Sequence, residues 1–356
     1  MTSDRTTSDP LLEVDDLRVA FHTDAGLVRA VDGVSFSVGR GETTCLVGES
    51  GSGKSVTAEA ITRLTPSPPG EIDGGTVRFD GEDVTRATDS RLRELRGNRI
   101  AHVFQDPASA LNPVYTVGAQ IREAIRAHRD VGKRAARARA IDLLDATGIP
   151  EPATRVDDYP HEFSGGMKQR VCIAIALACD PDLLIADEPT SALDATVEAG
   201  ILDLFAELRA AFGTSLLFIT HDLGVASRIA DRVVVLYAGR VMESGPASAV
   251  FDRPAHPYTR ALLACRPGVP GGSRPIPGSL PDPVDPPDGC RFAERCPHAI
   301  AACRDGEHPA RHRVGDDDHH VSCIHYEGNE GTELGPPPGE GAAWPAWSTR
   351  AGGRDE

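Results

Sequence analysis

A run of eight residues has the types and spacing of a phosphate-binding loop. It reads Gly48-Glu49-Ser50-Gly51-Ser52-Gly53-Lys54-Ser55 and stands between the apolar run Thr43–Val47 and a helical segment. The glycines let successive backbone N–H groups point inward, and the N-terminus of the following helix adds the positive end of its dipole. Lys54 is expected to reach the β- and γ-phosphates of a nucleotide, and the Ser55 hydroxyl to be a ligand of Mg²⁺. The pattern and its context predict a P-loop that binds ATP.

Two acidic residues follow a second apolar run. The sequence Leu183-Leu184-Ile185-Ala186 leads directly into Asp187 and Glu188. Such a run is expected to be a buried strand, and open α/β sheets bind ligands at the carboxyl ends of their strands. Asp187 is suited to hold Mg²⁺ through water, and Glu188 is suited to orient and polarise the attacking water. Read without the P-loop, the pair could also be a solvated acidic turn.

A third element lies between these two and reads Phe163-Ser164-Gly165-Gly166-Met167-Lys168-Gln169-Arg170. It resembles the signature motif of ABC-type ATPases, although Phe163 and Met167 stand where that motif usually has Leu and Gln. Ser164 and the N–H groups of Gly165 and Gly166 are expected to open a helix and to form a second phosphate-binding N-terminus. In the family this surface closes on the nucleotide of the opposite subunit. The resemblance therefore implies that two chains hold two ATP molecules head to tail.

Further residues follow in the family's order. Gln105 comes after the run Ile100–Phe104, the loop Ser191-Ala192-Leu193-Asp194 comes just past Glu188, and His221 comes after Ser215–Ile219. By resemblance, Gln105 senses Mg²⁺ and the attacking water, Asp194 lies at the dimer interface, and His221 contacts the γ-phosphate. Phe21 is a candidate for stacking on adenine, because an aromatic face suits a purine ring. Phe21 could equally be a core residue near a strand end.

Two stretches resemble the ATPases of peptide importers in particular. They are Phe104-Gln105-Asp106-Pro107-Ala108-Ser109-Ala110-Leu111-Asn112-Pro113 and His256-Pro257-Tyr258-Thr259-Arg260-Ala261-Leu262-Leu263. This resemblance implies an importer of oligopeptides or dipeptides, with two membrane-spanning permease subunits, a second ATPase chain that makes a heterodimer, and an extracytoplasmic substrate-binding protein. It also implies a place at the cytoplasmic face of the cell membrane. The cargo itself is chosen by subunits other than this chain.

Three alternatives stay open at this point. The chain could energise an importer of nickel or another small solute, or it could be an ABC ATPase that acts on ribosomes or DNA without transport. A single cassette without heptad repeats argues against the ribosome or DNA type. The chain could also be a regulatory protein whose C-terminal cysteines bind metal.

The C-terminal cysteines form the pattern C-x5-C-x6-C-x19-C, made by Cys290, Cys296, Cys303 and Cys323. Their segment has too few large apolar residues to fold by burial alone, and small domains of this kind commonly use a metal. Widely spaced thiolates suit a [4Fe–4S] cluster, whereas zinc sites favour closer pairs, although His298, His308, His312 or His325 could replace a thiolate in a zinc site. The stretch Gly289–Pro297 also resembles the C-terminal module of peptide-importer ATPases, some of which carry such a cluster. The sequence favours a cluster of structural role, separated from the ATP site by a linker, and leaves zinc or no metal as the alternatives.

The elements that must position these residues alternate between short apolar runs and amphipathic helical stretches, which predicts an α/β fold. By resemblance this fold is the P-loop NTPase domain of ABC type, with an inserted helical lobe and a small Cys-rich module at the C-terminus. We expect a flexible N-terminus at 1–10, the ATPase domain at 11–265 with its lobe at about 107–165, and a Pro/Gly-rich linker at 266–289. The Cys-rich segment is expected at 290–326 and a disordered tail at 327–356.

The composition excludes several classes of protein. Among the 356 residues, 53 are acidic and 37 are Lys or Arg, so the formal charge of −16 does not favour binding to nucleic acid. No apolar run approaches the roughly 20 residues that span a bilayer. The polar start of the chain has no apolar core of a secretory signal, so we expect the protein to stay in the cytoplasm.

Overall fold

The computed structural model of the chain describes residues 9–191, 193–265, 275–315 and 317–327. Predictions for residues 1–8, Ala192, residues 266–274 and the tail from 328 onward lie outside this part. The described chain contains an eight-stranded sheet with the order β11-β12-β10-β9-β3-β8-β7-β6. Its parallel part is built from β3 (Thr43–Val47), β6 (Ile100–Val103), β7 (Leu183–Asp187), β8 (Ser215–Thr220) and β9 (Arg232–Tyr237).

A second, antiparallel sheet of the described chain has the order β2-β1-β4-β5. Its strands are β1 (Leu12–Thr23), β2 (Gly26–Val38), β4 (Gly70–Phe79) and β5 (Glu82–Asp83). The helix after the P-loop, α1 (Lys54–Ile61), packs against β1 and β2 and also against β7. A shared apolar core therefore fixes the helix of the P-loop between the two sheets, with Leu46 and Ile61 fully buried in it.

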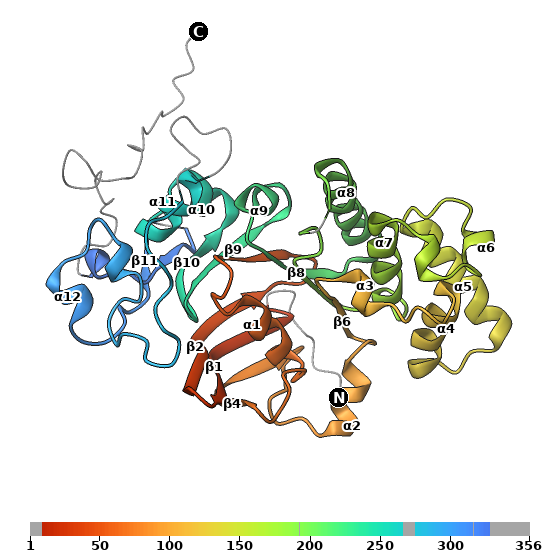
Figure 1. The fold of residues 1–356 in the computed structure, drawn as a ribbon, viewed down its shortest axis with the longest axis horizontal. Helices are drawn as coiled ribbons and strands as arrows, with labels where there is room; N and C mark the ends of the chain where they lie inside the picture. The colour runs from red at the N-terminus through yellow and green to blue at the C-terminus, as the bar shows by residue number, and fades with distance from the viewer. Residues whose placement is uncertain (1–8, 192, 266–274, 316, 328–356) are drawn as a thin grey trace, which may run out of the picture.

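Helices gather at one end of the main sheet, beyond β6 (Figure 1). They are α3 (Pro107–Ala110), α4 (Val117–His128), α5 (Lys133–Ala146), α6 (Pro152–Arg155) and α7 (Gly165–Ala176). The helix α8 (Ala195–Phe212) lies over the sheet itself, where Phe205 packs edge-on against Phe218 of β8. The stretch from Val117 to Thr147, whose pattern predicts helical structure, forms the two helices α4 and α5, with a break between His128 and Lys133. Gly132 caps the second helix there, so the chain turns and α5 packs back on α4.

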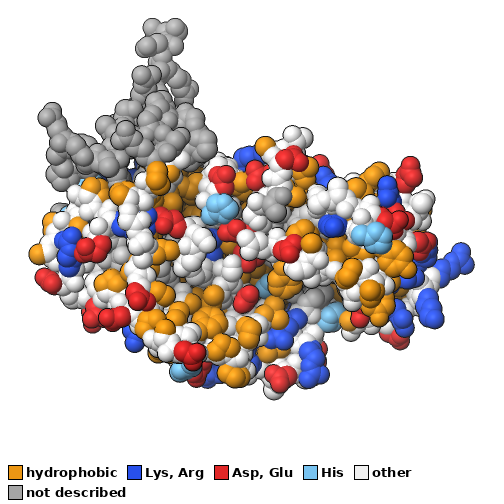
Figure 2. Space-filling view, viewed as in Figure 1, with side chains coloured by type: hydrophobic (Ala, Val, Ile, Leu, Met, Phe, Trp, Pro, Cys, Tyr) orange, Lys and Arg blue, Asp and Glu red, His pale blue; other side chains and the backbone are white. Residues whose placement is uncertain are grey.

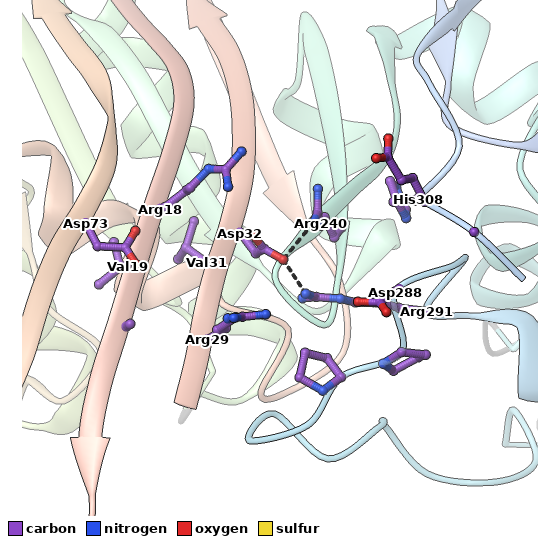
Figure 3. A pocket seen from close by; sticks show the side chains of 15 residues that line it. Arg18, Val19, Arg29, Val31, Asp32, Asp73, Arg240, Asp288, Arg291 and His308 are labelled. Atoms are coloured by element: carbon purple, nitrogen blue, oxygen red, sulfur yellow. Dashed lines mark hydrogen bonds and ion pairs between the residues drawn. The ribbon is translucent and has the colours of Figure 1, made fainter. Parts of the chain in front are cut away.

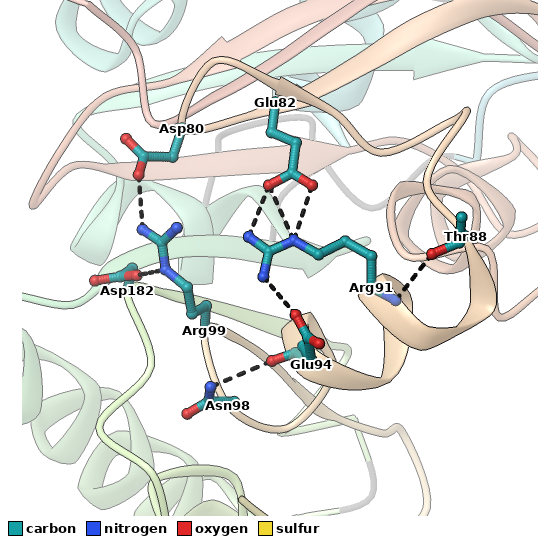
Figure 4. A network of polar contacts seen from close by, with 8 residues as sticks. All are labelled: Asp80, Glu82, Thr88, Arg91, Glu94, Asn98, Arg99 and Asp182. Carbon is teal, nitrogen blue, oxygen red and sulfur yellow. Dashed lines mark hydrogen bonds and ion pairs between the residues drawn. The ribbon is translucent and has the colours of Figure 1, made fainter.

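A network of arginines ties the antiparallel sheet to the start of the parallel strands (Figure 4). Arg99, just before β6, donates to Asp80 at 2.8 Å and to Asp182 at 2.6 Å. Nearby, Arg91 of α2 (Asp89–Leu95) makes a forked contact with Glu82, with Nη2 2.7 Å from Oε2. These charge-assisted bonds join β4, β6 and β7 at the edge opposite to the carboxyl ends of the parallel strands.

The chain from Tyr237 onward adds antiparallel strands to the other side of the sheet. These are β10 (Arg240–Pro246), β11 (His312–Arg313) and β12 (His320–Val321), and β12 pairs with β10. The helices of this half are α9 (Leu223–Ile229), α10 (Ala247–Asp252), α11 (Pro257–Ala264) and α12 (Ala301–Arg304). The described helices are each too short or too polar to cross a lipid bilayer.

Candidate functional site

The four predicted elements of the ATP site meet at one edge of the main sheet. The strands β3, β8, β7 and β6 are consecutive neighbours and run parallel. Their carboxyl ends carry, in that order, the P-loop, His221, the pair Asp187 and Glu188, and Gln105. Residues that lie far apart in the sequence are therefore neighbours in space, because parallel strands end at the same edge.

The P-loop needs glycine at two of its positions for steric reasons. Gly53 has a φ of 99°, and a Cβ atom on it would lie 2.4 Å from the carbonyl oxygen of Ala30. A Cβ atom on Gly48 would lie 2.1 Å from the carbonyl oxygen of Leu236. The backbones of β2 and β9 thus pack closely against the loop, and α1 begins directly after Gly53. The backbone N–H groups at the start of α1 are in place for an anion.

Lys54 lies under the loop with its ammonium group enclosed. Its side chain is 4 % exposed, and its Nζ donates to the carbonyl oxygens of Gly48 at 2.8 Å and Glu49 at 2.9 Å. Burial lowers the pKa of Lys54, and the negative charges of Glu188, Asp187 and Glu49 oppose that shift. A phosphate that binds Lys54 would replace the two carbonyl oxygens with a stronger, charged partner.

Asp187 has the properties of a side chain that can bind a cation. Burial raises the pKa of Asp187, while a hydrogen bond from Ser55 lowers it. Its Oδ1 is buried and has no hydrogen-bond partner among the described residues. An orphaned carboxylate oxygen beside a serine hydroxyl is a donor set that suits Mg²⁺, a hard cation that prefers oxygen ligands. The residues present therefore fit the predicted magnesium site.

Glu188 lies at the centre of the polar groups around the site. Gln105 donates from Nε2 to its Oε2 at 3.1 Å, and Nδ1 of His221 is 3.2 Å from the same oxygen. The ammonium group of Lys54 is 3.9 Å from the other oxygen. Glu188 also has a φ of 42°, an uncommon left-handed conformation for a residue with a side chain. The structure thus brings three of the predicted side chains to the carboxylate of a fourth.

The remaining predicted residues lie away from this carboxylate. Ser164 caps α7, accepting a bond from the N–H of Met167, and both Ser164 and Gly165 are exposed. α7 packs against β6, α3, α4, α5 and α8.

Two further predicted residues have visible local roles. Asp194 caps α8, accepting from the N–H groups of Thr196 at 3.1 Å and Val197 at 3.0 Å. Phe21 is half-buried in β1 and packs on the core between the two sheets. Both contacts are structural, so the roles of Asp194 at an interface and of Phe21 beside adenine stay predictions.

The Cys-rich segment, residues 290–326, packs against the main body of the protein. Cys290 and Phe292 belong to the same core as Val233 and Tyr237 of β9. Arg295 contacts Glu49 of the P-loop at 2.9 Å. The expectation that the linker separates this segment from the ATP site is therefore wrong. Residues 275–288 contain no helix or strand, but they run beside β2, where the N–H of Arg29 bonds the carbonyl oxygen of Pro283 at 3.0 Å.

A second tie crosses the same interface. Asp32 of β2 accepts from Arg240 of β10 at 2.7 Å and from Arg291 of the Cys-rich segment, beside a cavity of about 780 Å³ (Figure 3). The described residues that line this cavity include none from the P-loop. The sequence analysis missed Asp32, Arg291 and Arg295 as contact residues, because nothing local in the sequence links residues more than 240 positions apart.

The thiols of the Cys-rich segment are buried but show no metal-holding arrangement. Burial raises the pKa of Cys290 to about 11 and those of Cys296 and Cys323 to about 12. In the described ranges, no group of three or more His, Cys, Asp or Glu side chains is arranged to hold a metal ion. The predicted iron–sulfur and zinc sites therefore have no support from a preformed ligand geometry.

Comparisons with known proteins agree with the site. Residues 31–191 match the family model "ABC transporter", and residues 242–303 match "Oligopeptide/dipeptide transporter, C-terminal region". The chain is 46 % identical to the dipeptide transport ATP-binding protein DppD of Bacillus subtilis over 88 % of this chain and 94 % of that protein. It is 49 % identical to the oligopeptide transport ATP-binding protein OppD of the same organism, over 82 % of each chain.

The fold has solved relatives as well. One is a dimeric, post-hydrolysis structure of the ATP-binding cassette MJ0796 bound to ADP and Pi, with a TM-score of 0.60 and 27 % identity, covering 66 % of this chain and 98 % of that one. This likeness and the family match confirm the predicted P-loop NTPase fold of ABC type. The chain belongs to the ATP-binding proteins of ABC transporters, in the oligopeptide/dipeptide transporter family.

Proposed function

We propose that this chain is the ATP-hydrolysing subunit of an ABC importer for oligopeptides or dipeptides. The observation that carries the chemistry is the convergence of Lys54, Gln105 and His221 on the carboxylate of Glu188, beside the unpartnered Oδ1 of Asp187. The observation that favours peptides is the likeness to DppD and OppD over more than four fifths of the chain. An importer of nickel or another small solute is the alternative.

Each residue of the site has a distinct role in the proposed reaction. The N–H groups of Gly48–Gly53 and the ammonium group of Lys54 bind the β- and γ-phosphates. Ser55, Asp187 and Gln105 would hold Mg²⁺, which supplies neutralisation of charge on the phosphate oxygens when bound. Glu188 orients and polarises the attacking water, and His221 contacts the γ-phosphate.

We also propose that the site is completed by a second chain. Ser164 and Gly165 are exposed at the start of α7 and can meet a nucleotide on another subunit. The related cassette MJ0796 is described as dimeric with ADP and Pi, which supports this arrangement. The resemblance to peptide importers favours a different ATPase chain as the partner, with Asp194 at the interface and adenine stacked on Phe21.

The proposed assembly places the chain at the cytoplasmic face of the cell membrane, held there by two permease subunits. An extracytoplasmic substrate-binding protein delivers the peptide and makes no contact with this chain. In this assembly residues 11–265 are the ATPase domain, with its helical lobe at about 107–165, and residues 290–326 are a C-terminal module. A non-transport role in ribosome or DNA work finds no counterpart in the relatives described above.

We also propose that a [4Fe–4S] cluster is bound by Cys290, Cys296, Cys303 and Cys323. Its support is the spacing of the four cysteines and the backbone bond from the N–H of Cys290 to the carbonyl oxygen of Cys303 at 2.8 Å, which brings two of them together. Thiols can bind iron once they are deprotonated. Such a cluster would stabilise the Cys-rich segment, and zinc is the competing metal.

The proposed function predicts that substitutions of Glu188 and Lys54 impair different steps, hydrolysis in one case and ATP binding in the other. Glu188→Gln should bind Mg-ATP with normal affinity but hydrolyse it roughly 100-fold more slowly, and should accumulate as an ATP-bound dimer, because only the orientation of water is lost. Lys54→Ala should weaken binding by about ten- to a hundredfold, the equivalent of a charge-assisted hydrogen bond. Fluorescence titration with an ATP analogue and a phosphate-release assay measure the two properties.

The exposed Glu207 of α8 offers a matched control, because Glu207→Gln removes the same charge far from the converging strand ends. It should leave both properties unchanged. Near-normal hydrolysis by Glu188→Gln would contradict the role assigned to that residue.

A further inference from the structure

The Cys-rich segment reaches into the P-loop through one arginine. Arg295 lies in the 3-10 turn Ala293–Arg295, and its guanidinium makes a forked contact with the carboxylate of Glu49. Nη1 is 2.9 Å from Oε2, and Nη2 is 3.1 Å from Oε1. The Arg295 side chain is 6 % exposed and that of Glu49 is 26 % exposed. A forked arginine–carboxylate pair fixes geometry as well as charge, and this pair is largely shielded from solvent.

The guanidinium of Arg295 is itself held from several sides. Its Nε donates to the carbonyl oxygen of Pro277 at 2.8 Å, and Nη2 donates to that of Ile276 at 3.1 Å. Nη1 donates to the hydroxyl of Tyr237 at 3.1 Å, and the group stacks near the rings of Tyr237 and Phe292. Because the linker, β9 and the Cys-rich segment all contribute contacts, the group presents a fixed fork to the P-loop.

Glu49 is also fixed through its backbone. Its N–H donates to the hydroxyl of Tyr258 at 2.9 Å, and the ring of Tyr258 packs edge-on against Tyr237 with 4.6 Å between ring centroids. The carbonyl oxygen of Glu49 accepts a hydrogen bond from Nζ of Lys54, so the proposed phosphate-binding lysine contacts the same residue that Arg295 holds. One P-loop residue is therefore held at its N–H by α11, at its side chain by the Cys-rich segment and at its carbonyl by Lys54.

We propose that Arg295 is a positioning residue for the P-loop, and that through Glu49 it makes the Cys-rich segment a determinant of ATP affinity. A loop with glycine at Gly48, Gly51 and Gly53 loses much conformational freedom when it closes on phosphate. The clamp, that is the Arg295–Glu49 pair, orders the P-loop before ATP binds, so less binding free energy is lost on ordering the loop. The inference rests on the proposed function, because it assumes that the P-loop binds ATP.

The test is a titration of the full-length chain with a fluorescent ATP analogue and Mg²⁺. Arg295→Ala and Glu49→Ala should each raise Kd about tenfold, the change expected when the binding-competent loop falls to about a tenth of the population. The double variant should bind no more weakly than either single variant, because the two residues act as one unit. Arg295→Lys should stay weak, because lysine keeps the charge but loses the fork.

Hydrogen exchange gives the readout that a general loss of stability would not produce. In Arg295→Ala and Glu49→Ala, the amides of Gly51–Gly53 should exchange faster while those of β3 stay protected. Arg304→Ala is the matched control, since Arg304 pairs with Glu294 in the same segment but both side chains are exposed, at 48 % and 77 %. It should leave Kd and exchange unchanged.

The outcomes separate this inference from the proposed function. A wild-type chain that binds no Mg-ATP would overturn the proposed function. A wild-type chain that binds, together with normal affinity in Glu49→Ala or effects that multiply in the double variant, would overturn only the clamp. Glu49→Ala decides the matter even if Arg295→Ala disturbs the fold of its segment, because Glu49 lies outside that segment.

Discussion

Single side chains at the ATP site have unusual local environments. Glu188 has a φ of 42° and two polar neighbours on one oxygen, and strained backbone of this kind clusters at functional sites. Asp187 is half-buried, and burial raises its pKa, so its carboxylate is more stable beside a cation than alone. The histidine at position 256 shows the same principle outside the ATP site.

His256 is predicted to make the protein acid-sensitive. His256 is 1 % exposed, and its Nδ1 accepts a hydrogen bond from the N–H of Tyr258 at 3.0 Å, which caps α11. Burial lowers the pKa of His256 to about 3, and the nearby charges of His308, Arg260 and His325 add to this effect. The unfolded chain therefore takes up a proton at this residue first, near pH 6.5, so stability is complete above that pH and is lost as the pH falls toward 3. The expected loss is about 1.4 kcal/mol per pH unit in that range.

Urea unfolding at pH 7.0 and pH 5.5 measures this loss. His256→Asn keeps a capping oxygen but cannot titrate, so its free energy of unfolding should fall less between the two pH values than that of the wild type. His161→Asn, at an exposed histidine, should keep the wild-type pH dependence. An unchanged pH dependence in His256→Asn would refute the assignment.

Among the secondary-structure elements, the buried parallel strands could be predicted and the C-terminal strands could not. Thr43–Val47 and Leu183–Asp187 are continuous apolar runs at a place where both faces of the sheet are covered, so the local sequence suffices. The strand β10 carries Glu243 at its centre, and that buried carboxylate is satisfied by the N–H groups of Ala255 and His256 and by His319. Those partners come from tertiary structure, which the local pattern does not contain. The same holds for Arg295 and Glu49.

The Cys-rich element gives a prediction about metal. The chain purified without oxygen should be brown and should contain about four irons, as a [4Fe–4S] cluster requires. Cys296→Ser should lose the iron, whereas Cys265→Ser, at a cysteine near the end of α11, should keep it. Colourless wild-type protein with one equivalent of zinc would reject the cluster.

The molecule as a whole is acidic, and part of its surface exposes large apolar side chains. Its formal charge is −16, and the visible face shows acidic and basic side chains interspersed (Figure 2). Large apolar side chains are nevertheless exposed near the Gln105 loop and the helical end of the sheet, including Phe104 at 48 %, Val114 at 71 % and Tyr115 at 55 %. Exposed apolar groups of this kind favour contact with other proteins, in keeping with the proposed permease subunits.

ATP hydrolysis by this chain is proposed to need partner subunits. The most direct test is the ATPase rate of the purified chain, measured alone and again after its second ATPase chain and permease subunits are added. Because Ser164–Gly166 are proposed to meet a nucleotide on another chain, the chain alone should be a poor ATPase. Its rate should rise about tenfold or more in the complex, which corresponds to an activation barrier lowered by about 1.4 kcal/mol or more. A stable homodimer of the purified chain that is already fully active would contradict the account.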